Sequence, residues 1–284
     1  MAPKSSATDA ARAPIIPFRG RASVVAKPVI RALPPGVLQA PPQVRSPAID
    51  LTGQRKVWFL SGRGKTGKTM LARYIADRMA DLGGSAVVAA CDPVNRSLRR
   101  FLDNIAEPPS SDTEEVKDWL WGLLHAAMTE QFSALIDLGG GDSSLTSLVA
   151  QMPGLAQILS EGGIEPVAVY LVGADPDDLT PLEIAERQGF QPRATAVVLN
   201  EFAGRRHRFD PILQDPTVRG ALDRGAVQLW MPSLWNVAAE ACNTNAWRFQ
   251  DAVSHGDAFV ASSVSDWLKR MDAEFEPIRS WIPA

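Results

Sequence analysis

The chain has 284 residues, a hydrophobic fraction of 45% and a formal net charge of −3, which suits one α/β domain with an appendage. No apolar run reaches the roughly 18 residues that cross a bilayer, and no apolar leader with a small-residue cleavage site opens the chain. Cys91 and Cys242 are too few for a disulfide framework and fit no zinc spacing, so we expect a reduced, cytoplasmic protein.

Residues 1–50 are predicted to form a disordered, basic, proline-rich tail. Seven Lys and Arg residues face the single acid Asp9 within residues 1–49, so this segment carries +6 and the remainder −9. Nine of the 22 prolines also fall here, and proline resists both helix and sheet. The tail suits a basic arm for nucleic acid, acidic lipid or a protein partner, or a solvated leader, and charge does not choose between them.

Residues 51–284 are predicted to form one domain with a helical C-terminal part. Six near-continuous apolar runs predict strands buried on both faces: Val57–Leu60, Ala86–Ala90, Ala134–Leu138, Val167–Val172, Ala194–Leu199 and Val227–Met231. Helical patterns lie between them at Lys68–Leu82, Ser97–Ile105, Thr113–Thr129, Ser143–Ser160 and Thr180–Arg187, and again from Val237 on. The alternation predicts an α/β fold, a mostly parallel sheet with helices on both faces.

The segment Gly62-Arg63-Gly64-Lys65-Thr66-Gly67-Lys68-Thr69 joins the first predicted strand to the first predicted helix. Glycines in such a turn let backbone amides surround anionic oxygens, and the helix N-terminus adds positive potential. Lys68 is placed to reach the β- and γ-phosphates of a nucleotide, and the Thr69 hydroxyl to bind Mg²⁺. An accidental match is the alternative, but the strand before and the helix after favour a phosphate-binding P-loop.

Residues 63–69 resemble the deviant Walker A loop of the ParA/MinD family of ATPases, KGGxGK[ST]. Further segments resemble that family in the same order: VVAACDPVNRSL its D-x-D-P segment, ALIDLGGGD its Walker B strand, AVVLNEF its base-contacting strand and VQLWMPSL its last core strand. The resemblance covers roughly residues 55–240. It implies a P-loop NTPase fold with ATP and Mg²⁺ as cofactors.

For the phosphates and the metal, the resemblance implies that Gly62–Thr69 and the following Met70 hold the nucleotide. Asp137 matches the Walker B aspartate, which would support Mg²⁺ together with Thr69. The position of Asp137 at the end of a predicted strand agrees, because ligands bind at the carboxyl edge of a parallel sheet. A helix-capping acid is the alternative for Asp137.

For catalysis and the base, Lys68 and Arg63 would neutralise charge, and Asp92 matches the aspartate that orients the attacking water. A turn acid before Pro93 is the alternative for Asp92. Asn200 matches the base-contacting asparagine and Pro232 lies beside it, so adenine is the expected base. Gly139-Gly140-Gly141 is expected to form a loop that changes shape when the γ-phosphate leaves, a turn requiring positive φ, or both.

The chain departs from the family pattern at three positions. Arg63 stands where the family has the lysine that reaches across a dimer, Lys65 replaces the second glycine, and Ala90 replaces the first aspartate of D-x-D-P. Arginine keeps the charge with another geometry, and Lys65 restricts the backbone. These departures suggest an outlying branch, close to ATPases of plasmid stability and conjugal transfer.

The function expected is that of a slow ATPase that forms an ATP-dependent homodimer, responds to an activating protein partner and serves DNA segregation or cargo positioning. The alternatives are a P-loop small-molecule kinase or synthetase, and a degenerate nucleotide-binding scaffold. Arg205, Arg206 and Arg208 suit a DNA or partner contact, a phosphate lid or a solvated loop. The final stretch SDWLKRMDAEFEPIRSW has nearly balanced charge, so we expect it to pack on the domain rather than bind membrane.

Overall fold

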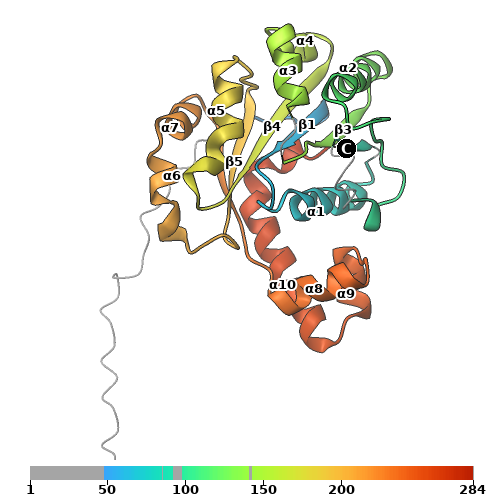
Figure 1. The fold of residues 1–284 in the computed structure, drawn as a ribbon. Helices are drawn as coiled ribbons and strands as arrows, with labels where there is room; N and C mark the ends of the chain where they lie inside the picture. Colours follow the sequence, from blue (N-terminus) through green and yellow to red (C-terminus); the bar gives the residue numbers. More distant parts are fainter. Residues whose placement is uncertain (1–47, 85, 92–97, 141–142, 284) are drawn as a thin grey trace, which may run out of the picture. The chain divides into compact units, whose positions relative to one another are not determined.

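Six strands form a single parallel sheet in the computed structural model, which describes residues 48–84, 86–91, 98–140 and 143–283. The strand order is β2-β3-β1-β4-β5-β6 (Figure 1). The strands are β1 (Arg55–Ser61), β2 (Ala86–Ala90), β3 (Ser133–Asp137), β4 (Ile164–Val172), β5 (Ala194–Asn200) and β6 (Val227–Met231). All six predicted strands and their parallel pairing are confirmed.

Each face of the sheet carries its own hydrophobic core, because successive strand residues point to opposite faces. In β1, Trp58 and Leu60 belong to one core, whereas Val57 and Phe59 belong to the other. The first core is covered by α1 (Lys68–Asp81), α8 (Asn236–Thr244), α9 (Phe249–His255) and α10 (Ala258–Phe275). The second is covered by α2 (Thr113–Glu130), α3 (Ser144–Gln151), α4 (Leu155–Glu161), α5 (Thr180–Arg187), α6 (Asp210–Gln214) and α7 (Pro216–Asp223). Helices on both faces are therefore confirmed.

The single helix predicted over Ser143–Ser160 is wrong, since the structure has α3 and α4 there. The break falls at Pro153 and Gly154. Proline cannot donate to the preceding turn, and Gly154 has φ 86°, a left-handed conformation outside helical geometry. The Pro-Gly pair was a signal for this break in the sequence itself.

The helix predicted over Ser97–Ile105 is also wrong for its described part, where a 3₁₀ turn, η1 (Leu98–Arg100), replaces it. The chain instead returns along β2: the Ala106 amide donates to the Val88 carbonyl and the Ala90 amide to the Ala106 carbonyl, both at 2.9 Å. These bonds pair backbone groups of β2, which is an edge strand of the sheet. Helical periodicity in the sequence gives no sign of such pairing.

The C-terminal stretch packs on the domain as expected. Val264, Trp267, Met271 and Phe275 of α10 are buried in the first core, and the Trp267 indole donates to the Pro232 carbonyl at 2.8 Å. Across the part of the chain that the structure describes, every helix is too short or too polar to cross a bilayer. The predicted tail at residues 1–50 falls almost wholly outside the described residues and stays a prediction.

Candidate functional site

The loop between β1 and α1 leaves the middle of the sheet at its carboxyl edge (Figure 1). β3 and β4 flank β1, and Leu60 of β1 lies opposite Asp137, the last residue of β3. The helix that follows begins at Lys68, has no acidic residue in its first turn, and receives no side-chain cap from Gly67. Its first amides are thus positioned to meet an anion without a competing carboxylate.

Two glycines of the loop lie where a side chain would not fit. A Cβ at Gly62 would lie 2.5 Å from the Leu171 carbonyl oxygen. A Cβ at Gly67, where φ is 100°, would lie 2.8 Å from Asn200 Nδ2 and 3.0 Å from Met231 Cε. Because glycine has no Cβ, the loop can lie directly against β4, β5 and β6 at these points. Its backbone also stays accessible to a ligand bound in the loop.

Lys65 adopts φ 68°, the left-handed conformation that side chains disfavour. It stands where glycine is expected in the resembling loops, so the position keeps a glycine-like backbone although it carries a lysine. The loop stores about 1 kcal/mol of strain at this residue.

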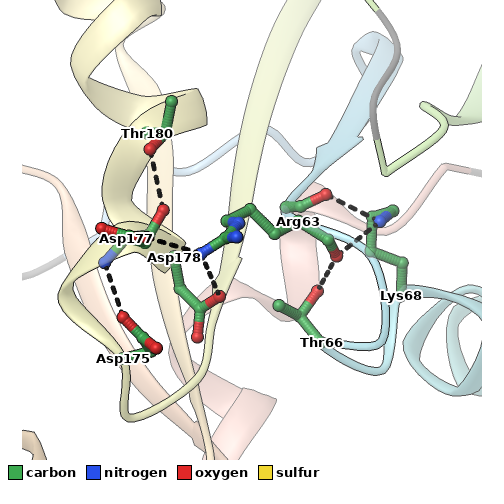
Figure 2. Close-up of polar contacts among 8 residues, drawn as sticks. Arg63, Thr66, Lys68, Asp175, Asp177, Asp178 and Thr180 are labelled. Carbon is green, nitrogen blue, oxygen red and sulfur yellow. Dashed lines mark hydrogen bonds and ion pairs between the residues drawn. The ribbon is translucent and has the colours of Figure 1, made fainter.

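The interior of the loop is occupied by the Lys68 amine and the Thr66 hydroxyl (Figure 2). Lys68 Nζ donates to the carbonyl oxygens of Gly62 and Arg63 at 2.7 and 3.0 Å. Thr66 Oγ1 donates to the Arg63 carbonyl at 2.8 Å. A turn of this shape that holds a cation in its interior can bind phosphate oxygens.

Arg63 extends away from the loop toward the segment η2 (Pro176–Leu179) that follows β4 (Figure 2). Its Nη1 lies 3.4 Å from Asp177 Oδ2 and 3.9 Å from Asp178 Oδ1. The side chains of Arg63 and Asp177 are 44% and 77% exposed, so water screens this ion pair and it holds Arg63 weakly. Sequence reasoning did not single out either aspartate, because nothing local links them to residue 63.

Asn200, at the end of β5, holds the other end of the loop. Its Nδ2 donates to the Thr66 carbonyl at 2.7 Å, while its Oδ1 accepts from the Phe202 amide at 2.9 Å. Asn200 is 4% exposed and Thr66 5% exposed, so the bond between them is shielded from water, whereas the bond to the Phe202 amide is only partly buried. The carboxamide thus positions the loop, and contact with a base stays a prediction for it.

A pocket of about 380 Å³ opens beside Asn200 and is called the Asn200 pocket below. Among the predicted binding residues, its lining includes Lys65, Gly67, Met70, Asn200 and Pro232. It also includes residues that sequence reasoning missed: Phe202, Ser233, Asn236, Glu240 and Asn243. Asn236, Glu240 and Asn243 come from α8, whose periodicity predicted a helix and gave no sign of which side chains would face a ligand.

The wall that α8 contributes is joined to α1 by Arg73. This side chain is 3% exposed and donates to Asn243 Oδ1 at 3.1 Å and to the Trp247 carbonyl at 2.7 Å. Its guanidinium lies 3.6 Å from the Phe101 ring centroid and 4.5 Å from that of Phe249. Burial lowers the pKa of Arg73 to about 10, which leaves it charged at neutral pH.

The oxygen donors expected at a Mg²⁺ ion lie on neighbouring elements. Thr69 is the second residue of α1, and Asp137 ends β3 with its carbonyl accepting from the Cys91 amide at 2.9 Å. The described residues hold no group of three His, Cys, Asp or Glu side chains that could bind a metal alone. Two such donors suit Mg²⁺, which binds through one or two protein oxygens plus phosphates and water. Asp92 lies outside the described residues.

The basic segment after Asn200 is partly committed to the fold. Arg206 donates to Glu201 at 2.7 Å and to Glu274 at 3.3 Å, and its guanidinium lies 4.7 Å from the Trp230 ring centroid. Arg205 and Arg208 are exposed. A contact with DNA or with a partner stays a prediction for these two side chains.

No protein-family model and no curated protein matches the chain. Among solved structures, the chain is similar to a chain of a MinC:MinD cell division protein complex of Aquifex aeolicus, with 14% identity, 77% of this chain and 96% of that chain covered, and a TM-score of 0.41. It is also similar to the cell division protein FtsY of Thermotoga maritima, with 13% identity, 64% and 63% covered, and a TM-score of 0.43. The functional argument rests on the site's own residues.

Proposed function

We propose that the chain binds ATP with Mg²⁺ on residues 62–69 and hydrolyses it slowly as a nucleotide-dependent dimerisation switch. One observation carries this proposal: Lys65 and Gly67 belong to the glycine-bearing loop and also line the Asn200 pocket. A nucleotide with its phosphates in the loop can therefore place its base among Met70, Asn200 and Pro232. The volume of about 380 Å³ suits a purine, and ligand pockets of this kind combine apolar walls with a few polar groups.

The phosphate-binding step follows from the contacts of Lys68. Its amine bonds two carbonyls of its own loop, and phosphate oxygens would take over as partners because their negative charge attracts the ammonium more strongly than a neutral carbonyl does. Thr69 and Asp137 would hold Mg²⁺, which supplies charge neutralisation and orientation in phosphoryl transfer. Asp92 would orient the attacking water.

The switch is assigned to Arg63. Its ion pairs with Asp177 and Asp178 are long, and the nearer one, with Asp177, is exposed to water, so exchanging them for a phosphate across a dimer costs little. Arginine can bind phosphate through two parallel N–H bonds, which favours a defined closed dimer. The cargo would be DNA or a protein assembly, with Arg205 and Arg208 as contact residues and a protein partner as activator.

The test is the light-scattering mass of the full chain with ADP and with a non-hydrolysable ATP analogue plus Mg²⁺. We expect the mass to double with the ATP analogue alone. Lys68→Ala should lose nucleotide binding and stay monomeric, whereas Arg63→Ala should bind nucleotide and stay monomeric. An unchanged mass with nucleotide still bound would exclude the dimer switch and favour a small-molecule kinase or a structural nucleotide site.

The degenerate scaffold remains the second candidate because of Lys65, whose left-handed backbone makes the loop more strained than a glycine-rich one. Turnover decides between the two proposals. Phosphate release that stays at the level of Lys68→Ala, with DNA and with MgATP in excess, would favour the scaffold.

A further inference from the structure

The walls of the Asn200 pocket divide into an apolar part and a polar part. Met70, Met231 and Leu234 belong to the apolar part, against which a planar ring can pack. The polar part comes largely from α8, which contributes Asn236, Glu240 and Asn243. Apolar packing does not distinguish one base from another of similar size, so the choice of base falls to the hydrogen-bonding groups of the polar part.

Two groups at the strand side of the pocket are already bonded within the protein. The Pro232 carbonyl accepts from the Trp267 indole at 2.8 Å. The Asn200 Oδ1 accepts from the Phe202 amide at 2.9 Å, while its Nδ2 donates to the loop. An amine of a bound base would have to share either of these acceptors with a group of the protein.

Glu240 is an acceptor that is not committed in this way. It is the acidic side chain of the pocket lining that the structure describes, and within the described chain it has no hydrogen bond or ion pair. Glu240 is exposed, so a ligand in the pocket can reach its carboxylate. Asn236 and Asn243 lie four residues before and three residues after it on α8, which places the three side chains on one face of the helix.

Asn243 supplies the complementary kind of group. Its Oδ1 accepts from Arg73 at 3.1 Å, which leaves the N–H bonds of its amide for a ligand. Side chains three residues apart on a helix have Cβ atoms roughly 5–6 Å apart, a separation that suits two neighbouring groups of one base. Adenine carries its N6 amine, a donor, beside the ring acceptor N7, which matches an acceptor at Glu240 and a donor at Asn243.

We propose that Glu240 is a specificity-determining residue, whose carboxylate accepts a hydrogen bond from the N6 amine of adenine in the Asn200 pocket. This proposal rests on the nucleotide site proposed above and names the group that selects the base there. Asn243 donates to the ring nitrogen beside the amine, while Asn200 holds the loop. Because the Glu240 carboxylate is exposed and hydrated before a ligand binds, the bond raises affinity by a modest factor.

The test is calorimetric titration of the full chain, with Mg²⁺, against ADP, GDP and purine riboside 5′-diphosphate, which has hydrogen in place of the N6 amine. We expect ADP to bind about fivefold to tenfold more tightly than purine riboside diphosphate, and more tightly than GDP. Equal affinities for ADP and purine riboside diphosphate, or tighter binding of GDP, would overturn the assignment of Glu240 and leave the nucleotide site standing. If none of the three binds, the nucleotide site fails as well.

Three variants assign the preference to the side chain. Glu240→Ala should stay folded, because alanine favours a helix and the position is exposed, and should bring the two affinities within about twofold by weakening ADP alone. Glu240→Gln keeps an acceptor oxygen without its charge and should retain a preference of about twofold to threefold. Glu130→Ala, at an exposed glutamate that ends α2, is the control and should retain the full preference.

Two results with Glu240→Ala would contradict the proposal. A preference that survives this substitution would place the amine of adenine elsewhere. A loss of the same factor for ADP and for purine riboside diphosphate would show that Glu240 supports the pocket wall and does not contact the amine.

Discussion

The two ends of the phosphate loop are held in opposite ways. At the end nearer α1, Asn200 bonds the Thr66 carbonyl in a buried setting, and Gly67 presses against the same carboxamide. At the β1 end, the half-exposed Arg63 reaches the exposed Asp177 over 3.4 Å and the largely covered Asp178 over 3.9 Å. Buried hydrogen bonds are costly to break, whereas exposed ion pairs contribute little. The loop therefore has two differently held parts. The part at the Asn200 pocket is held by a buried bond and is called the fixed half. The part at Arg63 is held by ion pairs that a ligand can replace and is called the exchangeable half.

The strongest test of the fixed half is Gly67→Ala. The new Cβ would meet Asn200 Nδ2 at 2.8 Å at a residue with φ 100°, so we expect the free energy of unfolding to fall by about 3 kcal/mol. Gly83→Ala is the matched control, with φ 69° and nothing within 4 Å, and should lose about 1 kcal/mol. Urea denaturation measures both, and equal losses would show that the contact with Asn200 does not fix the loop.

Asn200→Ala should have the next largest effect. It leaves the buried Thr66 carbonyl without its partner and removes the acceptor of the partly buried Phe202 amide, so the free energy of unfolding should fall by about 2 kcal/mol. Asn245→Ala is the control, since this exposed amide also donates to a carbonyl, that of Ala241 at 2.9 Å. The control should change stability by less than about 0.5 kcal/mol. A similar loss in both variants would contradict the distinction between buried and exposed bonds.

Lys65→Gly tests the backbone strain at Lys65, which lies between the two halves of the loop. Glycine adopts φ 68° without a steric penalty, so the variant should gain about 1 kcal/mol of stability in the same denaturation assay. Asn104→Gly, at φ 58°, should gain less because asparagine tolerates this conformation better. Should Lys65→Gly lose stability instead, the lysine side chain contributes more than its backbone costs.

The smallest effect is expected at the exchangeable half. Asp177→Asn weakens the ion pair of Arg63, so stability should change by less than about 0.5 kcal/mol while affinity for the ATP analogue rises by up to about threefold. Asp266→Asn removes another exposed pair, with Arg270 on α10, and should leave affinity unchanged. A large loss of stability in Asp177→Asn would mean that both halves of the loop are fixed.

The sheet and the loop were predictable from the sequence because their signals are local. Strands buried on both faces, such as β5, are continuous apolar runs, and the P-loop pattern spans eight adjacent residues. The contacts of Arg63 with Asp177 join positions more than a hundred residues apart, so no local pattern reveals them. The lining of the Asn200 pocket by α8 was missed for the same reason. The errors at Ser143–Ser160 and Ser97–Ile105 arose where Pro-Gly geometry and sheet pairing outweigh helical periodicity.

The Arg73 contacts constrain any redesign of the Asn200 pocket. Asn243 forms part of the pocket wall and at the same time receives the guanidinium that ties α8 to α1. Replacing Asn243 would remove one of the two hydrogen-bond acceptors of the buried Arg73, so an engineer seeking a different ligand preference would disturb the helix that carries Lys68 and Thr69. Ser233 and Glu240 line the same pocket and are not the hydrogen-bond acceptors of Arg73 described above, so a library of variants should begin at those two positions.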